Sequence, residues 1–196
     1  MNKSDKETIL EIKDLSVNYI STGNIISAVK KVSFSLEKNK MLGIIGETGS
    51  GKSSLIRAVN GLIKHPGTTS FDKLEILSKI GSSNIFDFSK MRGSEIGFIP
   101  QNTFGSLNPV YKIKKQFYFV NKKHQLFSKK EIGREIIKSL SEVGIADPER
   151  VSNSYSFELS GGMAQRVVIA LACFAKPRLL FADETTTGLD VTVERQ

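Results

Sequence analysis

One short segment carries the residue types that binding a chain of phosphates requires. Gly46–Ser53 reads GETGSGKS, which fits the pattern G-x-x-x-x-G-K-[ST]. Glycines let backbone N–H groups converge on phosphate oxygens, a following helix N-terminus adds positive partial charge, Lys52 can reach the outer phosphates and Ser53 can ligate Mg²⁺. The alternative is a Gly-rich turn without a ligand. We predict a nucleoside triphosphate site formed by Gly46, Glu47, Thr48, Gly49, Ser50, Gly51, Lys52, Ser53 and Ser54.

Two adjacent carboxylates, Asp183 and Glu184, follow the apolar run Leu179–Ala182. Such a run predicts a buried strand, and ligands of parallel α/β sheets bind at the carboxyl ends of strands. One carboxylate can hold Mg²⁺ while its neighbour orients or deprotonates an attacking water. The alternative is an ordinary acidic pair on the surface.

The elements that must position these groups follow from periodicity. Ile9–Tyr19 and Ile25–Leu36 alternate apolar with polar residues, which predicts an antiparallel β opening. Met41–Ile45 is a short apolar run, which predicts a buried strand before the Gly-rich loop. Lys52–Ile63 places its apolar residues on one helical face. We therefore expect a strand, the loop and a helix in succession.

The second half of the chain has a different character. After a less regular stretch, Glu95–Ile99 predicts another short strand. Ser128 and Glu131 have the spacing of a capping box, and apolar residues recur at helical spacing up to Gly144. We interpret this stretch as a helical subdomain inserted into an α/β core. A helix over 163–175, the strand Leu179–Ala182 and a helix start near Val191 complete the prediction.

Composition narrows the class of protein. The 196 residues include 28 Lys+Arg and 20 Asp+Glu, for a net charge of +8, and 39% are hydrophobic, with a mean hydropathy of −0.14. These values suit a globular α/β domain. The single Cys173 cannot form an internal disulfide. The longest apolar run, 167–175, is too short to cross a bilayer, and the first residues do not look like a signal peptide.

A further segment, Leu159–Met163, reads LSGGM and directly precedes a predicted helix. With this segment the chain resembles the ATP-binding-cassette (ABC) ATPases, whose signature is LSGGQ or a close relative. The phosphate-binding loop, the signature, the carboxylate pair and the later Thr187–Asp190 occur in the order of that family. The resemblance implies ATP and Mg²⁺ as cofactors. It also implies head-to-tail stacking of two cassettes, with the partner's γ-phosphate contacted by Ser160, Gly161, Gly162 and Met163.

The resemblance assigns roles to further positions one by one. Tyr19 corresponds to the aromatic residue that stacks on adenine, and Gln101 to the glutamine that senses the γ-phosphate and hinges the helical subdomain. Metal ligation is implied for Ser53, Gln101 and Asp183. Glu184 would be the general base, and Asp190 would lie in the loop after the carboxylates.

One branch of the family fits best. Gln101–Pro109 reads QNTFGSLNP, which is similar to a stretch found in peptide and nickel importers, and Gly162-Met163 points the same way. The resemblance implies an ATP-hydrolysing subunit at the cytoplasmic face of the cell membrane. Its expected partners are a second cassette, identical or paralogous, permease subunits and, indirectly, an extracytoplasmic substrate-binding protein. No nucleic-acid partner is expected.

The chain also departs from the family pattern. Thr185 stands where proline is usual, and Gly188 stands where a residue such as alanine is common. The family's switch histidine lies beyond the position of Gln196, and neither His65 nor His124 can replace it. Two alternatives stay open: an incomplete cassette without turnover of its own, and a soluble ABC ATPase acting on DNA or ribosomes.

The expected architecture is a P-loop α/β core with an N-terminal antiparallel β subdomain and an inserted helical subdomain, without the C-terminal part of the cassette. We expect the β subdomain and loop core over residues 1–101. The helical subdomain, which ends in the signature, should cover 102–160. The signature helix, the carboxylate strand and the following loop should cover 161–196.

Overall fold

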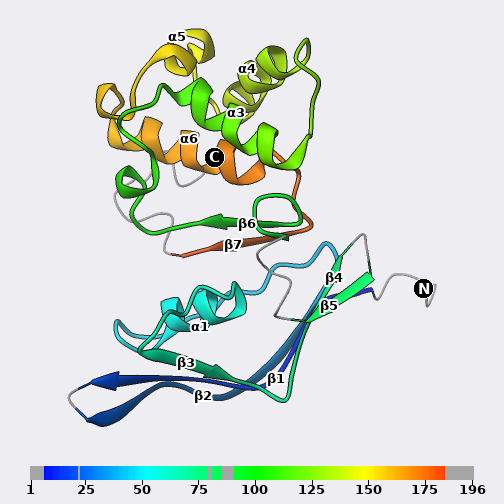
Figure 1. Ribbon diagram of the computed structural model, residues 1–196, viewed down its shortest axis with the longest axis vertical. Coiled ribbons are helices and arrows are strands. Elements are labelled where there is room, and N and C mark those ends of the chain that lie inside the picture. The colour runs from blue at the N-terminus through cyan, green and yellow to red at the C-terminus, as the bar shows by residue number, and fades with distance from the viewer. Residues whose placement is uncertain (1–6, 22, 79–80, 85–90, 184–196) are drawn as a thin grey trace. The chain divides into compact units, whose positions relative to one another are not determined.

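The computed structural model describes residues 7–21, 23–78, 81–84 and 91–183. The chain divides into two compact units, Met1–Arg92 and Gly93–Gln196, and each has its own sheet and its own core (Figure 1). Antiparallel strands dominate the N-terminal unit and helices dominate the C-terminal unit. This combination confirms the predicted α/β class.

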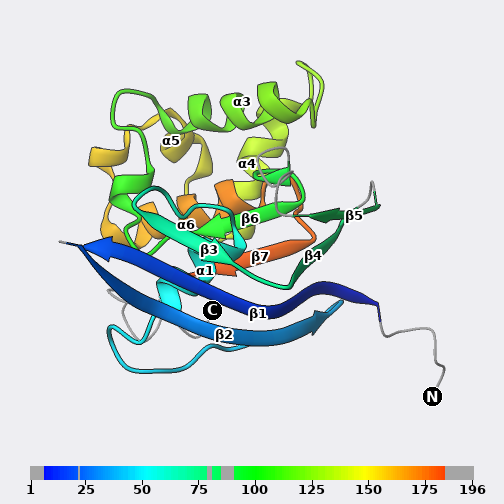
Figure 2. The same ribbon diagram turned by 60° about the horizontal axis from the view of Figure 1, so that its bottom comes forward.

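The sheet of the N-terminal unit is built around a long hairpin. β1 (Thr8–Ser21) pairs with β2 (Asn24–Glu37) in antiparallel fashion, which confirms the predicted β opening (Figure 2). Three short strands that we did not predict complete the sheet: β3 (Gly67–Ser70) and β4 (Lys73–Ser78) pair with β1, and β5 (Gly81–Asn84) pairs with β4.

Cross-strand pairs of apolar residues hold this sheet together. Leu10 lies opposite Ile76 and Ile12 opposite Leu74, and all four side chains are at most 2% exposed. Because successive side chains of a strand point to opposite faces, this register buries one apolar face and leaves the charged residues in water. Leu74 and Ile76 therefore determine how β4 docks on β1.

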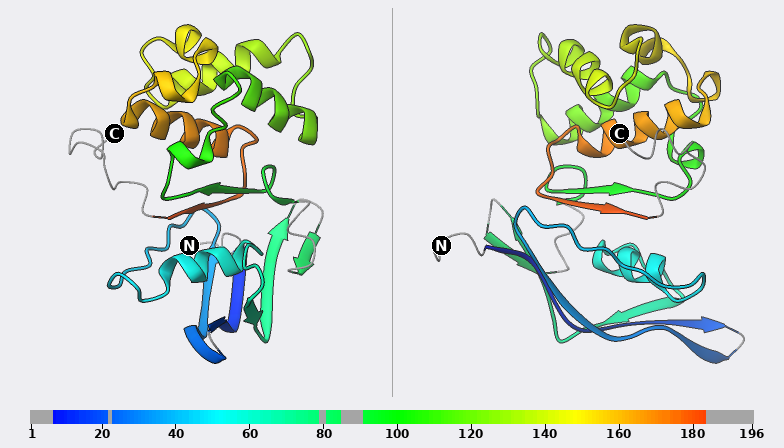
Figure 3. Two further views of the ribbon diagram at one scale, coloured as in Figure 1. Left: turned by 60° about the vertical axis from the view of Figure 1, so that its left-hand side comes forward. Right: turned by 180° about the vertical axis from the view of Figure 1, so that it is seen from behind.

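Helix α1 (Lys52–Val59) lies against this sheet and buries its apolar residues Leu55, Ile56, Ala58 and Val59 (Figure 3). It is shorter than the predicted helix 52–63. The Asn60 side chain donates to the carbonyl of Ile56, and the Arg92 guanidinium donates to the carbonyls of Asn60 and Gly61. The helix ends because Gly61 has a left-handed φ of 62°, and the N–H groups of Gly61 and Leu62 donate to the carbonyls of Ala58 and Arg57, which is the pattern of a glycine C-cap.

The predicted buried strand Met41–Ile45 is wrong for this structure. The segment has no strand pairing among the described residues, and Met41 and Ile45 are 97% and 98% exposed. An apolar run becomes a strand only when a neighbouring strand offers N–H and C=O groups, and no described strand runs beside this one. Apolar composition indicated burial here, but pairing decides it.

The C-terminal unit contains the two strands that the sequence predicted, β6 (Ile96–Ile99) and β7 (Leu179–Ala182), and the structure pairs them in parallel. Helix α6 (Gly161–Cys173) packs on β6, and the helices of the unit lie on one side of the strand pair (Figure 1). A Cβ at Gly97 would lie 2.7 Å from the carbonyl oxygen of Ala172. Glycine at this position therefore allows the end of α6 to approach the strand.

Helices α3 (Ile113–His124), α4 (Ile132–Glu142) and α5 (Pro148–Asn153) complete this unit, together with the 3-10 turns η2 (Phe104–Ser106) and η3 (Ser156–Glu158). One apolar core joins them to α6 and β6, with Phe117 completely buried at its centre and packed edge-on against Phe174. Among the described residues, no helix has both the length and the apolarity to cross a bilayer.

Helices α4 and α6 both begin after a serine, but the details differ from the prediction. Before α4, the Glu131 carboxylate accepts hydrogen bonds from the N–H and the hydroxyl of Ser128, at 3.1 and 2.6 Å. These bonds hold the pKa of Glu131 below its ordinary value. Helix α6 begins at Gly161, two residues before the predicted start at 163, because Ser160 caps it.

Candidate functional site

The Gly-rich loop lies directly before α1, as the motif requires. Gly49 and Gly51 have φ angles of 83° and 96°, in the left-handed region that favours glycine. A Cβ at Gly51 would also collide with the carbonyl oxygen of Ala28 in β2. Gly51 therefore satisfies two requirements, a left-handed turn and a close approach to the sheet.

Lys52 lies over the loop that precedes it. Its Nζ donates to the carbonyl oxygens of Gly46 and Glu47, at 2.7 and 2.8 Å. No acidic residue occurs in the first turn of α1. A loop with two left-handed glycines, a helix whose first turn has no acidic residue and an adjacent ammonium group form a cradle that fits a polyphosphate anion.

Tyr19 and Ser54 meet in the N-terminal unit although 35 positions separate them. The Tyr19 hydroxyl donates to the Ser54 hydroxyl at 3.3 Å, and the Tyr19 ring passes so close to Gly67 that a Cβ there would lie 2.9 Å from the ring. The end of β1 thus lies beside the start of α1. The aromatic residue expected to face adenine is adjacent to the residues expected to bind phosphate.

In the C-terminal unit, Gln101 and Asp183 follow neighbouring parallel strands. Ile99 of β6 pairs in register with Ala182 of β7, and the Asp183 N–H donates to the carbonyl of Ile99 at 3.0 Å. Asp183 is 3% exposed, whereas Gln101 lies on the surface. The carboxyl edge of the strand pair therefore presents a buried carboxylate and an exposed amide, as ligand sites of α/β sheets require.

Two predicted site residues, Glu184 and Asp190, lie outside the described residues. Within the described part of the chain, no group of three or more His, Cys, Asp and Glu side chains could hold a metal ion. Of the expected metal ligands Ser53, Gln101 and Asp183, only Asp183 is a carboxylate. Mg²⁺ prefers several oxygen ligands, so the assignment requires further oxygens from a bound phosphate.

The segment Leu159–Met163 forms the start of α6. Ser160 is the N-cap, and its Oγ accepts a hydrogen bond from the N–H of Met163 at 3.3 Å. Ser160 and Gly161 are exposed, and Leu159 anchors them in the core with 6% exposure. The first turn of α6 contains no acidic residue. A capped, exposed helix N-terminus of this kind has the polarity that attracts an anion.

Sequence reasoning missed two contacts that position the signature. The Phe104 ring of η2 lies next to Gly161, where a Cβ would be 3.9 Å from its Cε2. Arg166, on α6, donates to the carbonyl of Val143 at the end of α4. Both contacts join residues distant in sequence, and Arg166 lies three residues after the LSGGM segment, with nothing in the sequence to indicate its partner.

Comparisons with known proteins place this geometry in a family. The family described as "ABC transporter" matches residues 29–187. The chain is 39% identical over 197 residues to the oligopeptide transport ATP-binding protein OppD of Lactococcus lactis subsp. cremoris, with 98% of this chain and 57% of that protein covered. It is 42% identical over 191 residues to OppD of Bacillus subtilis, with 96% and 53% covered.

Another relative and a solved structure support the same family. The dipeptide transport ATP-binding protein DppD of Escherichia coli is 38% identical over 192 residues, with 96% of this chain and 58% of that protein covered. The dimeric structure of MJ0796, described as a bacterial ABC transporter cassette, matches with a TM-score of 0.78 and 25% identity, covering 95% of this chain and 78% of that one.

The fold is therefore that of an ATP-binding cassette. The chain belongs to the ABC transporter family, and the resemblance of its motifs to that family is confirmed. Its relatives named above are peptide transport proteins, which agrees with the branch indicated by the segment after Gln101. The chain spans a little over half the length of these relatives.

Proposed function

We propose that this chain is the ATP-binding and ATP-hydrolysing part of an importer of peptides. The observation that carries the proposal is the cradle formed by Gly49, Gly51 and Lys52 at the N-terminus of α1, in a chain whose relatives are named as peptide transport ATP-binding proteins. A solved relative of this fold is described as bound to ADP and Pi, which supports a nucleotide ligand.

In this proposal the N-terminal unit binds the nucleotide. Loop N–H groups and the Lys52 ammonium neutralise the phosphates, the Ser53 hydroxyl ligates Mg²⁺, and the Tyr19 ring faces adenine. Mg²⁺, when bound, neutralises charge on the transferred phosphate. Lys52 would exchange its two carbonyl partners in the loop for phosphate oxygens, which are better acceptors because they carry negative charge.

The C-terminal unit supplies the groups that act on the γ-phosphate. Asp183 supports the metal, Gln101 senses the phosphate, and Glu184 deprotonates the attacking water. Residues 102–160 form the helical subdomain, which is inserted in sequence between the two parts of the core, 1–101 and 161–196. This subdomain passes the change of nucleotide state on to the permease. One apolar core joins α3, α4 and α5 and also includes residues of α6 and Ile99 of β6, so these helices would move together with the signature helix.

We further propose that two cassettes stack head to tail at the cytoplasmic face of the membrane, with permease subunits as their partners. Ser160, Gly161, Gly162 and Met163 would then meet the phosphate held by the other cassette, and Asp190 would lie in the interface. Replacing Glu184 by Gln keeps the shape of the side chain and removes the base, so this variant should accumulate an ATP-bound dimer. Gel filtration that shows only monomer, with unchanged turnover, would contradict these assignments.

The phosphate cradle is tested by titrating Mg-ATP into the Lys52→Ala variant in a calorimeter. We expect the affinity to fall by about a hundredfold or more, because charge-assisted hydrogen bonds to phosphate are lost. The matched control is Lys64→Ala, which removes an exposed lysine beyond α1 and should leave the affinity unchanged. Equal affinities for the wild type and the Lys52 variant would refute the proposed site.

A further inference from the structure

The solvent side of α3 carries an unusual set of side chains. Its exposed positions repeat at helical spacing and are two lysine pairs that flank two aromatic residues: Lys114, Lys115, Tyr118, Phe119, Lys122 and Lys123. We call these six residues the α3 basic face. The opposite side of the helix is buried through Ile113, Gln116 and Phe117. Tyr118 and Phe119 are 39% and 44% exposed, so the core does not require these aromatic side chains.

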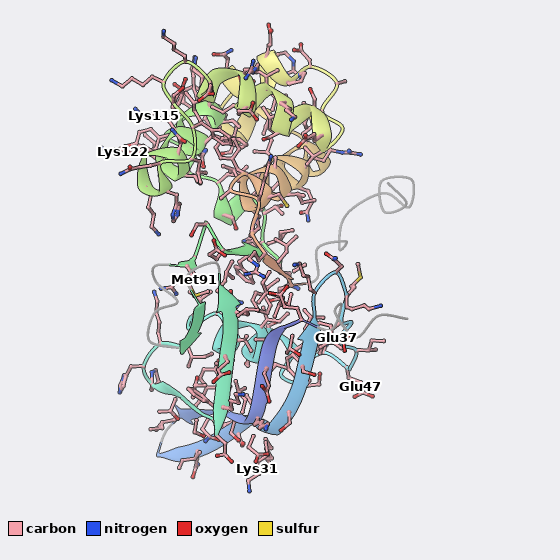
Figure 4. All side chains as sticks on the ribbon, turned by 90° about the vertical axis from the view of Figure 1, so that its right-hand side faces the viewer. Lys31, Glu37, Glu47, Met91, Lys115 and Lys122 are labelled. Carbon is pink, nitrogen blue, oxygen red and sulfur yellow. The ribbon has the colours of Figure 1, made fainter. Side chains whose placement is uncertain are left out.

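The chain segment that contains this face has charges of a single sign. From Ile96 to Lys130 the chain contains seven lysines and no aspartate or glutamate. The Lys115 ammonium lies 5.4 Å from the centre of the Phe119 ring, and the side chains of Lys115 and Lys122 project outward from the unit (Figure 4). A field of one sign on a regular helix attracts an extended anionic surface more strongly than it attracts a single small anion.

We propose that the α3 basic face binds the surface of a bilayer that contains anionic phospholipids. Lysines at a membrane surface extend their ammonium groups to lipid phosphates while their methylene stems cover apolar surface. Exposed aromatic rings are stable at the level of the lipid headgroups, because this layer has hydrocarbon on one side and water on the other. The inference rests on the proposed function for the presence of a membrane beside the chain.

The geometry of the rings favours a lipid surface over nucleic acid. Tyr111 and Phe119 contact each other edge to face, with centroids 5.1 Å apart and an interplanar angle of 79°, and Lys115 lies over the Phe119 ring. Proteins that bind single strands offer rings on which successive bases can stack. Here Phe119 already contacts a tyrosine and a lysine. Insertion into the headgroup layer needs only the outer edges of the rings.

The first test measures binding of the purified chain to vesicles by cosedimentation. Vesicles of phosphatidylcholine with phosphatidylglycerol should bind the chain, and vesicles of phosphatidylcholine alone should not. The triple variant Lys115→Gln, Lys122→Gln, Lys123→Gln should bind about a hundredfold more weakly, because each lysine near an anionic surface contributes about fivefold. High salt should weaken the binding of the wild type in the same direction.

A matched control removes the same number of charges elsewhere. Lys30, Lys64 and Lys138 are exposed lysines outside the α3 basic face. Their joint replacement by Gln should leave vesicle binding within a few-fold of the wild type. Equal losses in the two triple variants would show that only net charge matters, and would overturn the proposal.

A second readout follows from the absence of tryptophan in this chain. Phe119→Trp creates a unique fluorophore on the α3 basic face. Its emission should shift to shorter wavelength with anionic vesicles, and brominated lipids should quench it. Ile25→Trp, at the exposed tip of the β1–β2 hairpin, is the comparison and should show neither effect. An unchanged spectrum at position 119 would overturn the proposal.

Three further outcomes separate this inference from a nucleic-acid site and from the proposed function. If a single-stranded oligonucleotide binds the wild type and displaces it from vesicles, and the triple variant loses oligonucleotide binding, the face is a nucleic-acid site and the proposal fails. If vesicle binding is absent while Mg-ATP still binds, the lipid inference fails and the proposed function stands. Loss of Mg-ATP binding by the wild type would instead refute the proposed function.

Discussion

The two units support their functional residues in different ways. In the N-terminal unit, the Gly-rich loop before α1 is largely exposed, and Gly51 at its end approaches the Ala28 carbonyl so closely that a side chain would collide. In the C-terminal unit, Asp183 and Ser160 are positioned by elements of a dense apolar core. The difference teaches that residues proposed for one task, holding a phosphate, can depend on backbone geometry in one unit and on packing in the other. Substitutions should therefore separate ligand binding from stability.

The largest effect should come from the core of the C-terminal unit. Phe117→Ala removes a ring that is 0% exposed and contacts Phe174, so it should destabilise this unit by about 3–5 kcal/mol. Hydrogen exchange should accelerate in α3, α4 and α6 and stay unchanged in β1 and β2. Phe119→Ala, on the solvent side of the same helix, is the control. Equal acceleration in both units would show that they unfold together and would break the comparison.

The next effect should appear in the N-terminal unit as lost binding. Gly51→Ala combines a left-handed φ of 96° with a collision against Ala28, so the loop must move, and Mg-ATP affinity should fall by about a hundredfold. Gly49 has a similar φ of 83°, but a Cβ there would meet no atom within 4 Å. Gly49→Ala should therefore weaken the binding free energy of Mg-ATP only by the conformational strain, about 1–2 kcal/mol. Calorimetric titrations of both variants measure the difference. Equal losses would show that close approach to the sheet has no role.

Sequence reasoning succeeded where the determining interactions are local. The Gly46–Ser53 pattern predicted a loop before a helix because its chemistry lies within eight residues. The helical spacing of Ile132, Ile136 and Leu140 predicted α4, and all three side chains are at most 2% exposed. The strand Leu179–Ala182 was also predicted correctly, but its predicted burial was wrong: Leu179 is buried, whereas Leu180 is 44% exposed.

The rest depends on contacts between distant parts of the chain. The strand expected at Met41–Ile45 is wrong because a strand needs a partner, and no alternation or composition reports which partner is present. The contact of Tyr19 with Ser54 and that of Arg166 with Val143 join residues 35 and 23 positions apart. No motif or periodicity in the sequence around these residues predicts either contact.

A smaller effect should separate two roles of Ser160. Ser160→Ala removes the hydrogen bond to the N–H of Met163 and should destabilise the start of α6 by about 1 kcal/mol. Ser160→Asp keeps a good helix cap but adds a negative charge, so it should preserve stability and weaken ATP-dependent dimerisation. Thermal melts and gel filtration with ATP measure the two properties. If both variants dimerise as the wild type does, the signature does not contact phosphate.

The smallest effect should come from the charged side of the N-terminal sheet. In the register of β1 with β4, Glu11 faces Glu75 and Lys13 faces Lys73, so like charges lie directly opposite each other. Lys73 relieves this arrangement, because its Nζ lies 2.6 Å from Glu11 and 3.1 Å from Glu75. The hydrogen bond to Lys73 holds the pKa of Glu11 below its ordinary value of 4.5, and the bond to Glu11 raises the pKa of Lys73 above 10.5.

The sign of the pH dependence follows from these two shifts. The lowered pKa of Glu11 stabilises the fold above about pH 4.5, and this contribution is lost as the pH falls through the folded-state pKa. The raised pKa of Lys73 stabilises the fold below about pH 10.5 and is lost above it. Glu11→Gln should therefore lower the melting temperature slightly near neutral pH, and the difference from the wild type should shrink in acid. Because both side chains are about one third exposed, added salt should reduce it as well. A difference that persists unchanged in acid and in high salt would show that Glu11 acts through packing on β1, as the side chains of the other unit do.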